Sequence, residues 1–205
     1  THDRLAARLH TGEARLRRVD RAWTMLTGAG LPERVTVRWE LAHDEAFAKI
    51  AARGDEAADF AWAHSVHAEP AGLEPGRWYW YRFTALGQQS MVGRTRTAPA
   101  ADATATFDFA LASCQRWDVG HYAAWRHVAA EQLDAVLFVG DYIYEYPSGA
   151  KSVRPTEPGG VVRTLAQYRA RYATHKSDPA LQAAHAAAPW LLIWDDHEVG
   201  NDYAG

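Results

Sequence analysis

Apolar and polar residues alternate from residue 34 onward, which is the pattern of a strand with one buried face. In residues 34–41 the apolar side chains fall on one side, as Val35, Val37, Trp39 and Leu41. Similar patterns follow: a weaker one over 47–52, another over 62–68, a long aromatic run over 77–86 and a returning strand over 91–97. Short strands at this spacing, separated by turns such as Pro75-Gly76, predict a small all-β sandwich domain over residues 31–98.

The pattern changes after a small, polar and Pro-containing stretch at residues 97–105, which we interpret as a domain boundary. Apolar runs now alternate with helical patterns. The predicted strands are 107–112, 135–139 and 189–194, and the predicted helices are 121–132, 164–173 and 178–187. This order predicts an α/β portion over residues 99–205, built on a parallel sheet with both faces covered. Right-handed crossovers are expected between its strands.

Residues 1–30 stay unassigned. Leu5, Leu9 and Leu16 stand among several arginines, which is compatible with a short basic amphipathic helix or with a poorly ordered terminus.

Composition excludes some classes of protein. The net charge of −3 gives no overall basic field, so the chain carries no signature of nucleic-acid binding. No apolar run approaches the ~20 residues of a transmembrane helix. No apolar segment of a signal peptide follows Thr1–Arg4. Cys114 is the single cysteine, which excludes an internal disulfide and draws attention to its surroundings.

Three predicted strands end in polar clusters. These clusters are Ser113-Cys114-Gln115, Gly140-Asp141 with Tyr144, and Asp195-Asp196-His197 with Asn201. Parallel strands bring their carboxyl ends to one edge of a sheet, where ligands bind in open α/β sheets. A thiol, carboxylates, a phenol, an imidazole and an amide are together a set of metal ligands. Taken singly, the same residues also suit a buried cysteine, helix or turn caps and a core histidine.

These segments resemble a known family. The stretch GDYIYEY at 140–146, the run from 164 to 205 and the Ser113-Cys114-Gln115 strand end resemble the alkaline phosphatase D family of metallophosphoesterases. Residues 73–99 look like the strand-rich N-terminal domain of that family, so we expect a fibronectin III-like sandwich over 31–98. Residues 99–205 would be the first part of the catalytic domain. The spacing from Asp141 to Tyr144 is also similar to that of purple acid phosphatases.

The resemblance implies roles for individual residues. Cys114 and Tyr144 would be thiolate and phenolate ligands to Fe³⁺, and Asp141 would bridge the iron and a Ca²⁺ ion. Asn201 would bind the Ca²⁺. The implied reaction is hydrolysis of a phosphate ester, a monoester or a diester, by a water that the metals activate.

Three further residues have less defined roles. Asp196 and His197 lie in the family signature, where His197 would stabilise the transition state or orient a ligand, and Asp196 would orient a ligand. Arg116 would meet phosphate oxygens, with an exposed loop arginine as the alternative. Family members are commonly exported, which implies a secreted, periplasmic or cell-surface protein. The sequence indicates no oligomeric state.

The chain departs from the family at both ends. It stops at Gly205, whereas the family's catalytic domain continues and supplies further Asp and His ligands. Residues 1–30 do not match the glycine-rich opening expected of the family. An inactive truncated fragment with a partial metal site is therefore one alternative, and we expect the 205-residue chain alone to hydrolyse little or nothing.

A second alternative comes from another class of protein, in which the aromatic β domain is a binding module that uses Trp78, Tyr79 and Trp80. The two classes are separable by mutation. If the metal site is the functional centre, Asp141→Asn abolishes function and substitution of Trp80 does not. Loss of ligand binding on substitution of Trp80, with Asp141→Asn unaffected, would establish the binding module instead.

Overall fold

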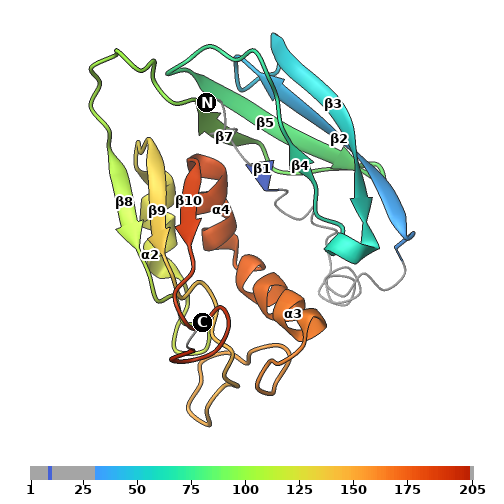
Figure 1. The fold of residues 1–205 in the computed structure, drawn as a ribbon, viewed down its shortest axis with the longest axis vertical. Coiled ribbons are helices and arrows are strands. Elements are labelled where there is room, and N and C mark those ends of the chain that lie inside the picture. The colour runs from blue at the N-terminus through green and yellow to red at the C-terminus, as the bar shows by residue number, and fades with distance from the viewer. Residues whose placement is uncertain (1–8, 11–30, 204–205) are drawn as a thin grey trace. The chain divides into compact units, whose positions relative to one another are not determined.

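The computed structural model describes residues 9–10 and 31–203, and the predictions made for the remainder of residues 1–30 lie outside them. The chain forms two compact units. The first holds the described residues up to Phe107 together with Ala186–Pro189, and the second holds Asp108–His185 and the residues from Trp190 onward. Figure 1 labels the elements of both, which are described separately below.

The first unit is built on an antiparallel sheet of five strands. Its order is β3-β2-β5-β6, and β7 also pairs with β5. The strands are β2 (Arg34–Ala42), β3 (Ile50–Asp59), β5 (Trp78–Ala85), β6 (Gln88–Gln89) and β7 (Gly93–Arg96). The predicted alternation in β2 is confirmed, since Val35, Val37, Trp39 and Leu41 are all buried. A two-stranded ladder joins β1 (Leu9–His10) to β4 (His67–Ala68). The described residues thus form one large sheet and one short ladder, and the fibronectin III-like sandwich stays a prediction.

The core of the first unit also bears on the proposed binding module. Tyr79 is buried in the same cluster as Leu41 and Phe83. The guanidinium of Arg94 lies 4.4 Å from the ring centre of Trp78 and covers it. Because Tyr79 points into the core, it is not available to an aromatic binding surface.

Two strand predictions in this unit are wrong. The predicted strand at 62–68 is replaced by a 3-10 helix, η1 (Phe60–Trp62), because the Asp59 side chain accepts a hydrogen bond from the Ala61 N–H and caps that turn. Ala63 then adopts a left-handed conformation, so strand geometry resumes only at His67. The strand predicted at 47–52 begins at Ile50 and continues to Asp59. Its polar residues concealed it, because Ala58 is the one buried residue of this strand at the sheet edge.

The second unit has the predicted parallel sheet. Its strands are β8 (Phe109–Ala112), β9 (Ala135–Val139) and β10 (Trp190–Ile193), in the order β10-β9-β8, and both pairings are parallel. The helices are α2 (Ala123–Ala130), α3 (Leu165–Lys176) and α4 (Pro179–Ala187). Thr164 caps α3 in a capping box with Gln167. Figure 1 shows the three strands side by side, all ending at the same edge of the sheet. Among the described helices, none has the length and apolar character needed to cross a membrane.

One face of this sheet is packed and the other is exposed. Val136 and Phe138 of β9 pack with Trp125 of α2 and Leu181 of α4. At strand positions outside this packed cluster, Leu111 of β8 and Ile193 of β10 are each 63% exposed. The expectation that both faces are covered is therefore wrong for the described residues, because their packed core lies on one side only.

The long loop between β9 and α3 is held in place by a buried arginine. Arg171 of α3 is fully buried and donates hydrogen bonds to backbone carbonyls of the loop. These acceptors are Tyr144, Tyr146, Glu157, Pro158 and Gly160. A guanidinium has five N–H donors in a fixed plane, so one side chain fixes both ends of the loop.

Arg171→Met should lower the free energy of unfolding by about 3 kcal/mol or more, since each buried acceptor left without a donor costs about 1–3 kcal/mol. Arg171→Lys should give an intermediate loss, because an ammonium reaches fewer carbonyls. Urea unfolding measures both, with Arg163→Met, on an exposed residue of the same loop, as the control. Equal stability of Arg171→Met and the control would contradict this role for Arg171.

Candidate metal centre

The ends of β8 and β9 have an unusual backbone. Cys114 and Asp141 both have a positive φ, 58° and 57°, and Gly140 has a φ of 96°. Non-glycine residues rarely adopt this conformation, and they do so mainly where the surrounding structure imposes it. Here the Cys114 N–H donates to Gly140 O at 3.1 Å and the Gln115 N–H donates to Asp141 O at 3.1 Å. These bonds continue the strand pairing past the last ladder residues and hold the two turns together.

Asp141 and Tyr144 meet as predicted. The Tyr144 hydroxyl donates to Asp141 Oδ2 at 3.0 Å, and Asp141 is buried. The second carboxylate oxygen, Asp141 Oδ1, is buried and has no hydrogen-bond partner among the described residues. Burial, the Asp141 carboxylate and the Cys114 thiol together raise the pKa of the Tyr144 phenol. A carboxylate, a phenol and a thiol, each of which can serve as an anionic metal ligand, therefore lie together.

Asp196 and His197 complete this cluster. One ligand atom each from Asp141, Asp196 and His197 lie within 4.8 Å of one another. The rings of Tyr144 and His197 are 4.2 Å apart between centroids. The backbone N–H of Asp202 donates to Asp196 at 2.7 Å and lowers the pKa of its carboxyl group. The structure thus brings together Cys114, Asp141, Tyr144, Asp196 and His197.

Two buried glutamates organise the cluster, and sequence reasoning assigned a role to neither. Glu198 accepts hydrogen bonds from the backbone N–H of Tyr142 at 2.5 Å and of Asp195 at 2.9 Å, so one carboxylate ties the ends of β9 and β10. Glu145 Oε2 lies 2.7 Å from His197 Nδ1, and Oε1 accepts from the Asn201 N–H at 2.8 Å. Their positions in the sequence could have indicated a role, because both glutamates lie inside the strand-end motifs that carry the predicted ligands.

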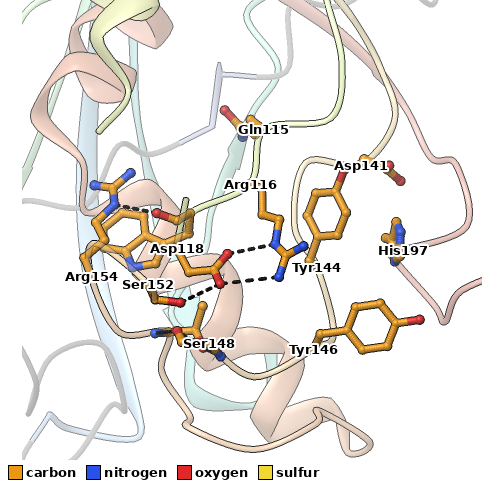
Figure 2. Close-up of polar contacts among 12 residues, drawn as sticks. Gln115, Arg116, Asp118, Asp141, Tyr144, Tyr146, Ser148, Ser152, Arg154 and His197 are labelled. Atoms are coloured by element: carbon orange, nitrogen blue, oxygen red, sulfur yellow. Dashed lines mark hydrogen bonds and ion pairs between the residues drawn. The ribbon is translucent and has the colours of Figure 1, made fainter. Parts of the chain in front are cut away.

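Asn201 and Arg116 lie at the margin of the cluster. The Asn201 side chain is exposed and donates to Asp202 Oδ2 at 2.7 Å, so it does not join the other predicted ligands here. Arg116 donates through Nε to Asp118 Oδ1 at 2.8 Å, and its guanidinium lies 5.8 Å from the Tyr144 ring centre. Figure 2 shows Arg116 between Asp118 and Tyr144.

The arginine is held in this place by a buried acid. Asp118 is buried and also accepts a hydrogen bond from the Ser152 hydroxyl at 2.8 Å. Burial opposes ionisation of this acid, but the hydrogen bonds from Arg116 and Ser152 prevail and lower its pKa. Arg116 is therefore exposed, and its pairing with Asp118 fixes the orientation of its guanidinium.

Carboxylates, a phenol, a thiol and an imidazole at the carboxyl edge of a parallel sheet define a candidate metal centre of an α/β enzyme. Two sequence models of one protein family match this chain. The sequence model of the PhoD-like phosphatase matches residues 109–205, and that of the PhoD-like phosphatase N-terminal domain matches residues 12–99. The second match begins upstream of residue 31, where the sequence alone suggested that the resemblance starts.

The chain belongs to the PhoD-like phosphatase family. It is 48% identical to alkaline phosphatase D of Bacillus subtilis (strain 168) over 186 residues, which are 87% of this chain and 32% of that protein. A solved structure of PhoD superposes with a TM-score of 0.83 at 48% identity, covering 87% of this chain and 35% of the PhoD chain. The mixed α/β class is thereby confirmed. The chain spans about a third of the length of both relatives.

Gly140→Ala tests the packing of the strand ends. An added Cβ would lie 2.3 Å from Asp195 Cβ and 2.7 Å from Asp195 N, and the φ of 96° is itself unfavourable for alanine. We expect a loss of about 1–3 kcal/mol in the free energy of unfolding and weaker metal binding. Gly149→Ala is the matched control, because its Cβ would meet nothing within 4 Å. Unchanged stability and metal binding in Gly140→Ala would contradict the close approach of these strand ends.

Proposed function

We propose that the protein is a metal-dependent hydrolase of phosphoric esters, of which this chain carries the N-terminal domain and part of the metal centre. The observation that carries the proposal is Asp141 Oδ1, a buried carboxylate oxygen without a partner among the described residues, beside Asp196 and His197. A buried unpaired carboxylate oxygen is costly in free energy, and a bound cation removes that cost.

The residues present suit the implied metals. Thiolate and phenolate are strong anionic donors for a trivalent ion, so Cys114 and Tyr144 would hold Fe³⁺, with Asp141 bridging to Ca²⁺. Burial and the neighbouring Asp141 favour the neutral phenol of Tyr144, and a cation beside it reverses that preference. Asn201, whose backbone is fixed by Glu145, would offer its amide oxygen to Ca²⁺ after its side chain turns from Asp202. When bound, the ions supply Lewis acidity and lower the pKa of a water molecule.

The chain's own side chains would act on the substrate around that centre. Arg116, oriented by Asp118, presents a guanidinium that can bind two phosphate oxygens side by side. His197 lies against Tyr144 and would stabilise negative charge or hold a proton as the ester bond breaks. Asp196, ionised through the hydrogen bond from Asp202, would orient a ligand. Phosphoryl transfer depends mainly on positioning and charge neutralisation, which this arrangement can supply.

The relative's name, alkaline phosphatase D, supports phosphate esters as the substrate class, with monoesters and diesters both included. Export to the periplasm, the cell surface or the medium is proposed on the same relationship. A partial metal centre remains the alternative for the chain by itself, since it spans about a third of its relatives.

Metal analysis of the purified full-length protein should find iron and calcium together. Asp141→Asn should lose both metals and at least about 100-fold of the hydrolysis of a bis(p-nitrophenyl) phosphate probe, because one residue would hold both ions. Asp134→Asn, just before β9 at the opposite end of the strand from Asp141, is the control and should keep metals and activity. Zinc alone, or full activity in Asp141→Asn, would contradict the proposal.

A further inference from the structure

Glu145 is a buried acid that is neither a proposed metal ligand nor a proposed substrate contact. It is 5% exposed, and each carboxylate oxygen has one hydrogen-bond partner. Oε2 contacts Nδ1 of His197 at 2.7 Å, and Oε1 accepts from the backbone N–H of Asn201 at 2.8 Å. The same acid therefore touches two segments that carry proposed site residues.

The proton between Glu145 and His197 can be placed by elimination. An ionised carboxylate only accepts hydrogen bonds, and the Asn201 N–H can only donate. With Oε1 accepting from Asn201 and Oε2 facing His197, the hydrogen of the second bond belongs to Nδ1 of the imidazole. A neutral His197 then has its lone pair on Nε2, the nitrogen left to accept a proton or bind a cation.

The backbone of Glu145 is itself fixed. The fully buried Arg171 donates to the carbonyls of Tyr144 and Tyr146, on either side of Glu145. The Val162 N–H donates to the Glu145 carbonyl at 3.0 Å. Because the backbone is held on both sides, the carboxylate is oriented before any ligand arrives, as a supporting residue of a precise site must be.

We propose that Glu145 is a positioning residue that fixes His197 in the Nδ1–H tautomer, which leaves Nε2 as the nitrogen available to the cluster with Asp141 and Asp196. By holding the Asn201 backbone through its other oxygen, it also sets the distance between the imidazole and the Asn201 segment. The purpose of this geometry, to orient His197 at a metal centre, rests on the proposed function. The tautomer itself is a property of the protein without metal.

Glu145→Gln tests the proposal with almost no change in size. The glutamine oxygen can keep the hydrogen bond from Asn201, which leaves an NH₂ group facing His197. That NH₂ donates to Nδ1 and so favours the Nε2–H tautomer. Long-range ¹H–¹⁵N NMR of metal-free protein, at a pH where the ring is neutral, should show Nδ1–H in the wild type and Nε2–H in the variant. Affinity for iron, titrated as the metal alone, should fall by about 10–100-fold, as happens when other carboxylates that orient the side chains of a metal site are removed.

Asp178→Asn is the matched control. Asp178 is equally buried, caps α4 through the Ala180 N–H and pairs with Arg154, so the substitution removes a buried carboxylate that lies outside the cluster. It should leave the His197 tautomer and iron affinity unchanged. A shift in tautomer with both substitutions would overturn the specific role of Glu145.

The wild-type spectrum decides the matter even if Glu145→Gln fails to fold. An Nε2–H ring in the wild type overturns the inference, as does an Nδ1–H ring that persists in the folded variant. Failure of the proposed function has a different signature: the tautomer would change as expected, while wild type and Asp141→Asn would show the same iron content.

Discussion

The candidate site depends on the close approach of two strand ends, β9 at Gly140 and β10 at Asp195. A side chain at residue 140 would collide with Asp195, so only glycine permits this approach. Glu198 then closes it by accepting the backbone N–H groups of Tyr142 and Asp195. With the strand ends tied, Asp141 is held in a left-handed conformation that its neighbours impose. The strain at the turn is thus offset by these hydrogen bonds.

Around this junction the chain concentrates buried charge. Glu145, Glu198 and Asp118 each accept at least two hydrogen bonds from the site or its loop, and Arg171 supplies donors to the loop carbonyls. Buried ionic groups are costly unless every polar atom has a partner. Among the described atoms of the cluster the exception is Asp141 Oδ1, a buried oxygen that a bound cation would satisfy.

Much of this arrangement could be predicted from sequence, and the misses have physical causes. Strand β9 and the helices α3 and α4 have strong local signals, and parallel strands bring their ends together whatever the loops do. The polar edge strand β3 and the turn at Asp59 were missed, because exposure removes the apolar pattern and a side-chain cap overrides propensity. Glu145 and Glu198 were missed for another reason. Most of their partners, which are His197 and the backbone N–H groups of Tyr142 and Asn201, lie more than 50 residues away in the sequence, and no local pattern encodes such contacts.

The central claim is that Asp141 Oδ1 faces a metal ion. Anomalous scattering at the iron absorption edge, from crystals of the full-length protein, tests it most directly. The account predicts a strong anomalous peak within coordination distance of Asp141, Tyr144 and Cys114. Iron bound to the protein without a peak near Asp141 would contradict it.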